Sequence, residues 1–249
     1  MSMSRIRTFF RSISDNVKSQ FKKSRCLLTI SVGQATHEGE LFAATMDLIN
    51  TSFESCIILI DDSLQRHTMA FNKAEDASFF YEKSIKEGQF WLTRNNIYYD
   101  KLTIPKKIIH WDMWLNHVNY KAQQKSIISL LESDPLYKAA FDQSIDEFLV
   151  KYCARLPEPD KFSIEIARQL SFDFVLEECT ALCLWPELEC HFECYPNKHN
   201  AAIEQTRKRF IFPSYPHLLQ SVTMGFKNAP QLQPQNFELF RQEDKITME

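Results

Sequence analysis

Two short apolar runs, separated by a segment of helical spacing, stand out in the first quarter of the chain. Residues 26–32 (CLLTISV) and 56–60 (CIILI) are almost continuously apolar and rich in residues suited to strands. Such runs are typical of parallel strands that are buried on both faces. Residues 40–50 (ELFAATMDLIN) lie between them and place apolar side chains on one helical face. The order of strand, glycine-containing loop, helix and strand predicts a βαβ unit.

The alternation of the two patterns continues along the chain. Residues 74–93, 121–152 and 163–184 have the apolar spacing of helices. Residues 107–110 and 188–195 have the pattern of strands, and a proline follows the second of them. Strands that alternate with helices favour an α/β fold with a doubly wound parallel sheet.

The two ends of the chain differ from this pattern. Residues 1–24 are basic, and their apolar positions from Ile6 to Phe21 recur at roughly helical intervals. Residues 226–249 contain prolines and many glutamines and asparagines. We therefore predict a basic N-terminal segment (1–24), a single α/β domain (25–225) and a C-terminal extension (226–249).

Composition and charge restrict the class of protein. The chain has 249 residues, 44% of them hydrophobic, which is enough to bury a sizeable core. Its formal net charge of -3 gives no bulk attraction to phosphate or anionic lipid, so nucleic acid could bind only at a local basic patch. No apolar run has the length of a membrane span, and we predict a cytoplasmic protein with no membrane partner. The odd number of cysteines, seven, argues against a disulfide framework.

Ser31 is the first candidate for chemistry. It lies at the end of the first apolar run, where parallel sheets place their ligands. Gly33 allows a sharp turn, and the loop with Gln34 and His37 leads into a helix whose N-terminal amides favour negative charge. The G-x-S-x-G elbow and the dinucleotide and P-loop fingerprints are all absent. An isolated S-x-G sequence is more often only a strand end and a turn, so this motif alone assigns no function.

A group of cysteines and histidines raises the question of a metal. The group consists of Cys179, Cys183, Cys190, His191, Cys194 and His199. Some of its gaps suit zinc, but the first two residues fit a buried helix face, and the strand pattern sends others to opposite faces. We predict no metal and no other cofactor.

Three segments, taken together, resemble the family of tRNA-dependent cyclodipeptide synthases. LLTISVGQATHEGE is similar to the family's apolar strand with the catalytic serine, with Thr29 where glycine often precedes it. FVLEECTAL is similar to its Y-[LVI]-x-x-E-x-P helix motif, with Glu178 at the glutamate. Phe174 and Thr180 replace the tyrosine and proline of that motif.

The third segment, Tyr195-Pro196, is similar to the Tyr-Pro pair of the subfamily named XYP, with Gln34 at the variable first position. The resemblance implies that residues 25–225 form a Rossmann-like catalytic domain similar to that of class I aminoacyl-tRNA synthetases. It also implies a reaction without ATP, because an aminoacyl ester on tRNA is already activated.

The resemblance further implies roles for individual residues in a ping-pong reaction. Ser31 would accept the first aminoacyl group as an ester, Glu178 would bind its ammonium group, and Tyr195 would relay protons during ring closure. The product would be a diketopiperazine. The residues expected to bind the substrate are Gly33, Gln34, His37, Phe174 and Pro196.

The implied partners are two aminoacyl-tRNAs used in sequence, with no obligate protein partner. Lys22, Lys23, Lys83, Lys86 and Arg94 are expected to bind tRNA phosphates. Acidic residues lie among the last three, so a solvated helix face explains that patch equally well.

Two other functions stay open at this point. A serine-dependent α/β acyl hydrolase would use Ser31, His37 and a carboxylate such as Asp61, although a triad histidine normally comes from a more distant loop. A tRNA-binding module that has lost its chemistry would explain the departures at Phe174 and Thr180.

Overall fold

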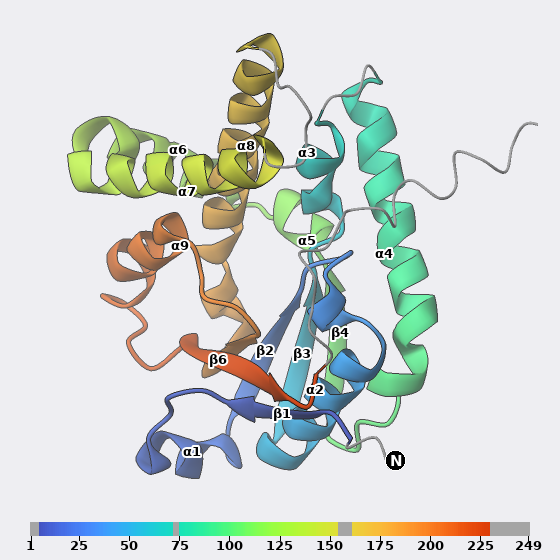
Figure 1. Cartoon of the computed structure of the whole chain (residues 1–249). Coiled ribbons are helices and arrows are strands. Elements are labelled where there is room, and N and C mark those ends of the chain that lie inside the picture. The colour runs from blue at the N-terminus through green and yellow to red at the C-terminus, as the bar shows by residue number, and fades with distance from the viewer. Residues whose placement is uncertain (1–4, 72–74, 154–160, 230–249) are drawn as a thin grey trace, which may run out of the picture.

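A six-stranded sheet with the order β1-β6-β5-β2-β3-β4 lies at the centre of the computed structural model (Figure 1). The structure describes residues 5–71, 75–153 and 161–229. The strands from β6 to β4 are parallel, and β1 pairs with β6 in antiparallel orientation at one edge. The strands are β1 (Arg7–Phe10), β2 (Arg25–Ile30), β3 (Ser55–Ile60), β4 (Lys106–His110), β5 (Phe192–Tyr195) and β6 (Gln220–Lys227).

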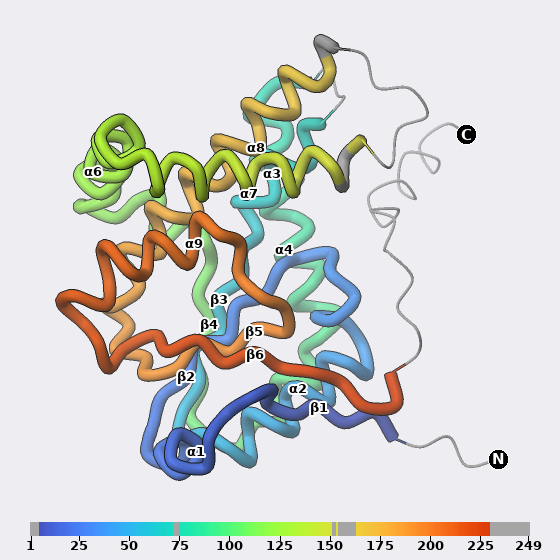
Figure 2. The backbone as a smooth tube through the Cα atoms, turned by 60° about the vertical axis from the view of Figure 1, so that its left-hand side comes forward, coloured from blue at the N-terminus to red at the C-terminus, as the bar shows by residue number. Residues whose placement is uncertain are grey.

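Helices cover both faces of this sheet (Figures 1 and 2), which confirms the predicted doubly wound α/β fold. One face packs against α1 (Asp15–Phe21), α2 (Gly39–Ser52) and α4 (Ala77–Tyr99). The other packs against α5 (Asp112–Leu115), α6 (Tyr120–Ser133), α7 (Pro135–Cys153), α8 (Lys161–Leu182) and α9 (Ala201–Thr206). The short helix α3 (Arg66–Met69) follows β3.

The chain reverses its direction across the sheet beside β2. It proceeds outward from β2 to β3 and β4, and then returns to add β5 on the other side of β2. In open α/β sheets such a switch point leaves a crevice beyond the carboxyl ends of the two strands, where ligands bind. The fold therefore directs attention to the ends of β2 and β5.

The continuous apolar run of β2 serves two cores. Leu28 and Ile30 pack with α2, whereas Leu27 packs with α8 on the opposite face. Because alternate side chains point to opposite faces, Thr29 and Ser31 lie on the α8 side. A strand without a solvent face needs apolar residues at nearly every position, which is why the sequence shows a run and not an alternation.

The N-terminal segment departs from the helical spacing predicted for it. Of residues 5–24, which the structure describes, Asp15–Phe21 alone are helical, and Arg7–Phe10 form the edge strand β1. In this strand Phe9 is paired with Gly225 of β6. A Cβ at position 225 would lie 2.6 Å from Arg11 Nε and 2.8 Å from a Phe9 ring carbon, so a larger residue here would have to displace these two side chains.

The boundaries near the C-terminus also differ. β6 continues to Lys227, past the predicted start of the extension at residue 226, and residues 230–249 lie outside the described residues. The predicted strand 188–195 begins only at Phe192, because a 3-10 turn and the left-handed backbone of Glu189 (φ 54°) precede it. Within the described ranges, none of the helices has the length and apolar character of a membrane span.

Candidate active site

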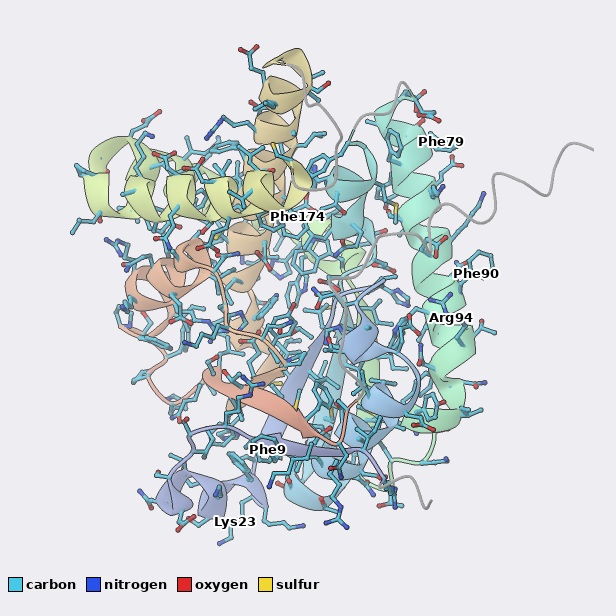
Figure 3. The ribbon with its side chains drawn as sticks, in the orientation of Figure 1. Phe9, Lys23, Phe79, Phe90, Arg94 and Phe174 are labelled. Atoms are coloured by element: carbon cyan, nitrogen blue, oxygen red, sulfur yellow. The ribbon has the colours of Figure 1, made fainter. Side chains whose placement is uncertain are left out.

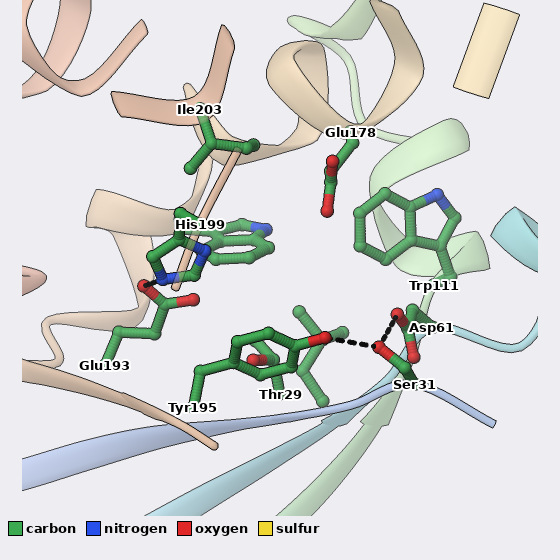
Figure 4. A pocket seen from close by; sticks show the side chains of 11 residues that line it. Thr29, Ser31, Asp61, Trp111, Glu178, Glu193, Tyr195, His199 and Ile203 are labelled. Carbon is green, nitrogen blue, oxygen red and sulfur yellow. Dashed lines mark hydrogen bonds and ion pairs between the residues drawn. The ribbon is translucent and has the colours of Figure 1, made fainter. Parts of the chain in front are cut away.

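A cavity of about 30 Å³ opens at the carboxyl ends of β2, β3 and β5, at the switch point of the sheet (Figure 4). Side chains from strands, loops and helices on the α8 side line it. They are Thr29, Ser31, Leu59, Asp61, Trp111, Glu178, Trp185, Glu193, Tyr195, His199 and Ile203. All three residues predicted to be catalytic are among them, so the fold brings together side chains that are up to 164 positions apart.

Ser31 lies at the centre of a short hydrogen-bond chain. Its Oγ donates to Asp61 Oδ2 over 3.0 Å and lies 3.1 Å from the hydroxyl of Tyr195. Because the serine hydroxyl uses its proton in the hydrogen bond to Asp61, the tyrosine hydroxyl is the donor in its contact with the serine oxygen. Only 8% of Ser31 is exposed. The serine is thus held between a carboxylate and a phenol, and water has little access to it.

Burial sets the protonation behaviour of these partners. It raises the pKa of Asp61 well above the ordinary value, and the hydrogen bond from Ser31 opposes this only in part. It raises the pKa of Tyr195 to about 12, so the phenol stays protonated at neutral pH. A carboxylate with a raised pKa is a stronger base than a solvated one, which suits it to accept the serine proton.

The loop after Ser31 shapes the backbone around the nucleophile. Gly33 has a φ of 86°, and the N–H of Gln34 donates to the carbonyl of Ser31, which closes the predicted turn. The N–H of Ser31 donates to His37 Nδ1 over 2.9 Å. The backbone N–H of Gln34 is thus used within the turn itself.

His37 therefore acts on the backbone of the serine and not on its hydroxyl. Burial lowers its pKa to about 4, so the ring is neutral at pH 7. The hydrolase triad of Ser31, His37 and Asp61 is not assembled, because Asp61 and not His37 accepts the serine hydroxyl. The structure gives the histidine a role in holding the loop.

Glu178 faces Ser31 and Tyr195 across the cavity from α8 (Figure 4). The side-chain amide of Asn200 donates to its Oε2 over 3.3 Å. Burial raises the pKa of Glu178 above its ordinary value, although His199, Asn200 and Arg207 lower it. Among the residues that the structure describes, none with a positive charge contacts this half-buried carboxylate directly, so it is suited to receive an ammonium group from a ligand.

A second layer supports Tyr195. The His199 ring stacks on the tyrosine ring with centroids 5.4 Å apart, and its Nε2 lies 3.1 Å from Glu193 Oε2. Glu193 and Arg207 form an ion pair with both side chains fully buried. Two charges this deep in the protein are stable only as a pair, so this layer fixes the position of the stacked histidine.

The residues predicted to bind substrate have mixed positions. Gln34 donates from Nε2 to the Tyr195 hydroxyl over 3.3 Å, and its Oε1 accepts from Asn197. Pro196 is buried directly after the tyrosine. Gln34, Gly33, His37, Pro196 and Phe174 are not among the side chains that line the cavity.

Phe174 is the residue that lies apart from the site. Its ring packs on Phe148 with centroids 5.1 Å apart, and only 7% of it is exposed. It lies on α8 (Figure 3), about one helical turn before Glu178 in the sequence. An apolar ring without a hydroxyl fits this core position, which explains why the residue is not tyrosine here.

The predicted tRNA-binding residues belong to two separate regions. Lys83, Lys86 and Arg94 lie on α4, whereas Lys22 and Lys23 follow α1 at the amino end of β2 (Figure 3). The carboxyl end of β2, with Ser31, is at the opposite end of the strand.

The helix α4 approaches the site closely. Gly88 lies against Asp62, and a Cβ at this position would be 2.5 Å from the Asp62 Cβ. Arg94 pairs with Glu38 of the serine loop over 3.0 Å, and Asn95 donates to the same carboxylate over 2.8 Å. The inner face of α4 is therefore anchored to the serine loop and to the segment that follows β3.

Several residues of the site escaped sequence reasoning. Asp61 entered only as part of the hydrolase alternative, and Trp111, Trp185, His199 and Asn200 were not predicted as members of the site. The position of Asp61 directly after the CIILI strand was a usable signal, because neighbouring parallel strands end at the same edge. Within the described residues, no three His, Cys, Asp or Glu side chains are arranged to hold a metal ion.

Comparison with known proteins decides the family. The chain is 39% identical to a cyclodipeptide synthase (CDPS) from Fluoribacter dumoffii, with a TM-score of 0.85 over 89% of this chain and 98% of that one. The chain belongs to the cyclodipeptide synthase family. No family model matches the sequence, and no curated protein does.

More distant cyclodipeptide synthases share the fold. The enzyme from Candidatus Glomeribacter gigasporarum, solved bound to Phe-tRNAPhe, is 17% identical with a TM-score of 0.72, over 88% of this chain and 94% of that one. A Mycobacterium tuberculosis protein described as relating cyclodipeptide synthetases to type I tRNA synthetases is 10% identical, with a TM-score of 0.60 over 91% and 95%. These matches confirm the predicted Rossmann-like fold.

Proposed function

We propose that this cyclodipeptide synthase joins the amino acids of two aminoacyl-tRNAs into a diketopiperazine through an ester on Ser31. The observation that carries the proposal is the chain of Tyr195, Ser31 and Asp61 facing Glu178 across a small cavity. An activated serine and a binding group for an ammonium are the two elements that this reaction requires.

In the first step the Ser31 oxygen attacks the ester carbonyl of the first aminoacyl-tRNA. Asp61 accepts the serine proton, the bond to the ribose oxygen breaks, and the proton passes to that oxygen as tRNA leaves. Glu178 holds the ammonium group of the aminoacyl moiety, which fixes the carbonyl above the serine. The products of this step are an aminoacyl ester on Ser31 and a tRNA with a free hydroxyl.

In the later steps the amine of the bound residue, once deprotonated, attacks the ester carbonyl of a second aminoacyl-tRNA, the bond to its ribose oxygen breaks, and the second tRNA leaves with a free hydroxyl. The dipeptidyl ester that forms on Ser31 then closes when its free amine attacks the seryl ester and releases the serine hydroxyl. Tyr195 lies 3.1 Å from Ser31 Oγ, where its hydroxyl can return a proton to the departing serine oxygen. Burial of the ester limits the competing attack by water.

The XYP-type subfamily is the branch that we infer for this chain. The motif Tyr195-Pro196 and the variable position Gln34 support it, and the two are connected, because Gln34 donates to the Tyr195 hydroxyl over 3.3 Å. Gln34 thereby helps to orient the tyrosine on Ser31.

The tRNA is proposed to lie along the outer face of α4. Lys83, Lys86 and Arg94 are on this helix, and exposed Phe79 and Phe90 lie among them (Figure 3). Basic side chains bind phosphates, and exposed aromatic rings can stack on unpaired bases. Lys22 and Lys23, at the far end of β2, contribute least to this surface.

Replacement of Lys83 and Lys86 by glutamate is expected to weaken tRNA use most strongly at low salt, while the same change at Lys22 and Lys23 has little effect.

The reaction can be tested in cells and with purified components. Bacteria that express the chain are expected to release a new cyclic dipeptide, detected by mass spectrometry of the medium, and Ser31→Ala is expected to abolish it. With purified protein and aminoacyl-tRNA labelled in the amino acid, acid-quenched wild-type protein is expected to carry the label, and Ser31→Ala is not. Folded protein that binds tRNA but never becomes labelled would instead support a binding module.

A further inference from the structure

Three large apolar side chains that line the cavity have little freedom to move. Trp111, Trp185 and Ile203 are 1%, 4% and 2% exposed. The two indole rings meet edge to face, with centroids 6.4 Å apart and an angle of 87°. The Trp111 indole N–H donates to Glu177 Oε1 over 2.9 Å, which fixes the ring further. Closely packed rings of this kind do not separate without a large loss of contacts.

The remaining volume is small compared with an amino acid side chain. A cavity of about 30 Å³ on this scale corresponds to roughly two or three water molecules. An aminoacyl group on Ser31 needs space for its α-carbon and ammonium before any side chain is placed. The volume that remains accommodates one or two further heavy atoms, which is less than the ring of phenylalanine or the branched chain of leucine requires.

The cavity is also polar in part. Glu193 and Glu178 both line it, and Glu193 Oε1 is buried without a hydrogen-bond partner among the described residues. Such an oxygen favours a ligand with a hydrogen-bond donor over an apolar one of similar size.

We propose that this cavity selects a small first aminoacyl group, that of glycine, alanine or serine. The inference rests on the function proposed above, since it names the residue that forms the ester on Ser31. The limit is imposed by Trp111, Trp185 and Ile203, and Ile203 is the wall residue whose truncation should enlarge the cavity with least disturbance of the paired indoles.

The test measures acylation of Ser31 in a single turnover. Glycine, alanine, serine, leucine and phenylalanine are each charged, with label, onto one tRNA sequence, and the series is repeated with each cognate tRNA. The three small residues are expected to label the wild-type enzyme, with leucine and phenylalanine at least ~100-fold slower, in the range by which pockets discriminate on size. Ile203→Ala is expected to raise the leucine rate relative to alanine by at least ~10-fold.

Ile127→Ala is the matched control, because Ile127 belongs to the same core cluster but does not line the cavity. It should leave the ratio of leucine to alanine unchanged. Wild-type acylation by leucine or phenylalanine at the rate of alanine would overturn the size limit and leave the proposed function intact. Absence of labelling by all amino acids on all tRNAs would overturn the proposed function and this inference with it.

Discussion

The cavity around Ser31 and the ionic cluster behind it contain neighbouring carboxylates with opposite properties. The cavity holds Asp61 and Glu178, whereas the ionic cluster holds the adjacent Asp62 and Glu177. The ionic cluster consists of Asp62, Arg66, His67, His110 and Glu177. Burial does not separate the two aspartates, because Asp61 and Asp62 are both at most 8% exposed, whereas Glu178 is half-buried and Glu177 is buried.

The difference lies in the hydrogen-bond partners. The Glu177 carboxylate accepts hydrogen bonds from both terminal nitrogens of Arg66 and from the Trp111 indole N–H, and it lies 3.3 Å from His67 Nε2. Burial would raise the pKa of Glu177, but the His67 and Arg66 contacts outweigh it and lower the pKa below its ordinary value.

Asp62 is equally well supplied with partners. It accepts the N–H of Ser63 over 2.9 Å, and its Oδ2 lies 2.6 Å from His110 Nδ1. Asp61, in contrast, has one oxygen on Ser31 and the other without a partner among the described residues. Asp61 and Asp62 are adjacent in the sequence, but Asp62 is held by structural hydrogen bonds, whereas Asp61 has an oxygen that is available to the substrate.

The largest contrast is expected between Glu178→Gln and Glu177→Gln. The first should nearly abolish cyclic dipeptide formation with little change in stability, because the amide cannot neutralise an ammonium group. The second should cost roughly 3 kcal/mol of stability, because it leaves Arg66 without its partner. Product formation and urea unfolding of both variants measure the two effects. Full activity of Glu178→Gln would remove this residue from the site.

Substitutions of the two adjacent aspartates should likewise differ, one affecting catalysis and the other affecting stability. Asp61→Asn is expected to slow acylation of Ser31 by roughly 100- to 10,000-fold, as loss of a general base does. Asp62→Asn should lower stability and leave acylation closer to wild type. Since the pKa of Asp61 is raised, the wild-type acylation rate should fall on acidification at a higher pH than for an ordinary aspartate. Single-turnover rates from pH 4.5 to 8 test this, and an Asp61→Asn variant with the same rate and pH profile would contradict the assignment.

The two regions also differ in their histidines. Burial lowers the pKa of His37 to about 4, whereas the hydrogen bond that His110 donates to Asp62 is the main cause that raises the pKa of His110. The folded state therefore binds a proton at His37 less tightly than the unfolded state, whose value is 6.5. Stability is lost as the pH falls through this window, and His37 accounts for about 2 kcal/mol between pH 7.5 and pH 5.

His37→Gln provides the comparison for this effect. The variant is expected to show a smaller loss of unfolding free energy between the two pH values, while other titrating groups contribute equally to both proteins. An identical pH dependence in urea unfolding would show that His37 is not held neutral in the folded state.

The smallest effect is expected for the group that positions Glu178. Asn200 caps α9 by accepting the N–H of Ile203 over 2.9 Å and donates its amide to Glu178. Asn200→Ser keeps a capping oxygen and removes the donor, so activity should fall about tenfold, the effect of roughly one hydrogen bond, without loss of stability. Asn200→Ala, which also loses the cap, should in addition be less stable by about 1 kcal/mol. Unchanged activity in both variants would show that Asn200 only caps α9 and does not position Glu178.

The sequence sufficed for the part of the fold in which local pattern and burial agree. The runs at β2 and β3 are apolar at nearly every position because both faces are covered, and Ser31 follows from the end of the first run. β1 and β6 could not be predicted, because their pairing joins residues more than 200 positions apart and Gly225 is explained only by the side chains that cross it.

The site was predictable where the family motifs reach and not beyond them. Ser31, Glu178 and Tyr195 carry motif positions, and the cavity contains all three. The amino-acid sequence does not show which of Asp61 and Asp62 belongs to the active site, because this depends on which of them contacts the serine and which contacts His110 after folding. His199 and Asn200 belong to a loop without a repeating pattern, so their contacts appear only in three dimensions.

The pairing of β1 with β6 has a consequence for synthesis of the chain. About 210 residues separate Phe10 from Gln220, and a ribosome that adds roughly 5 to 20 residues per second needs about 10 to 40 seconds to make them. During this time β1 has been made but its partner has not, and β5 still lacks β6 on its outer side. The edge of the sheet is therefore completed late in translation, and a pause before residue 220 would prolong the exposure of an unpaired strand to other nascent chains.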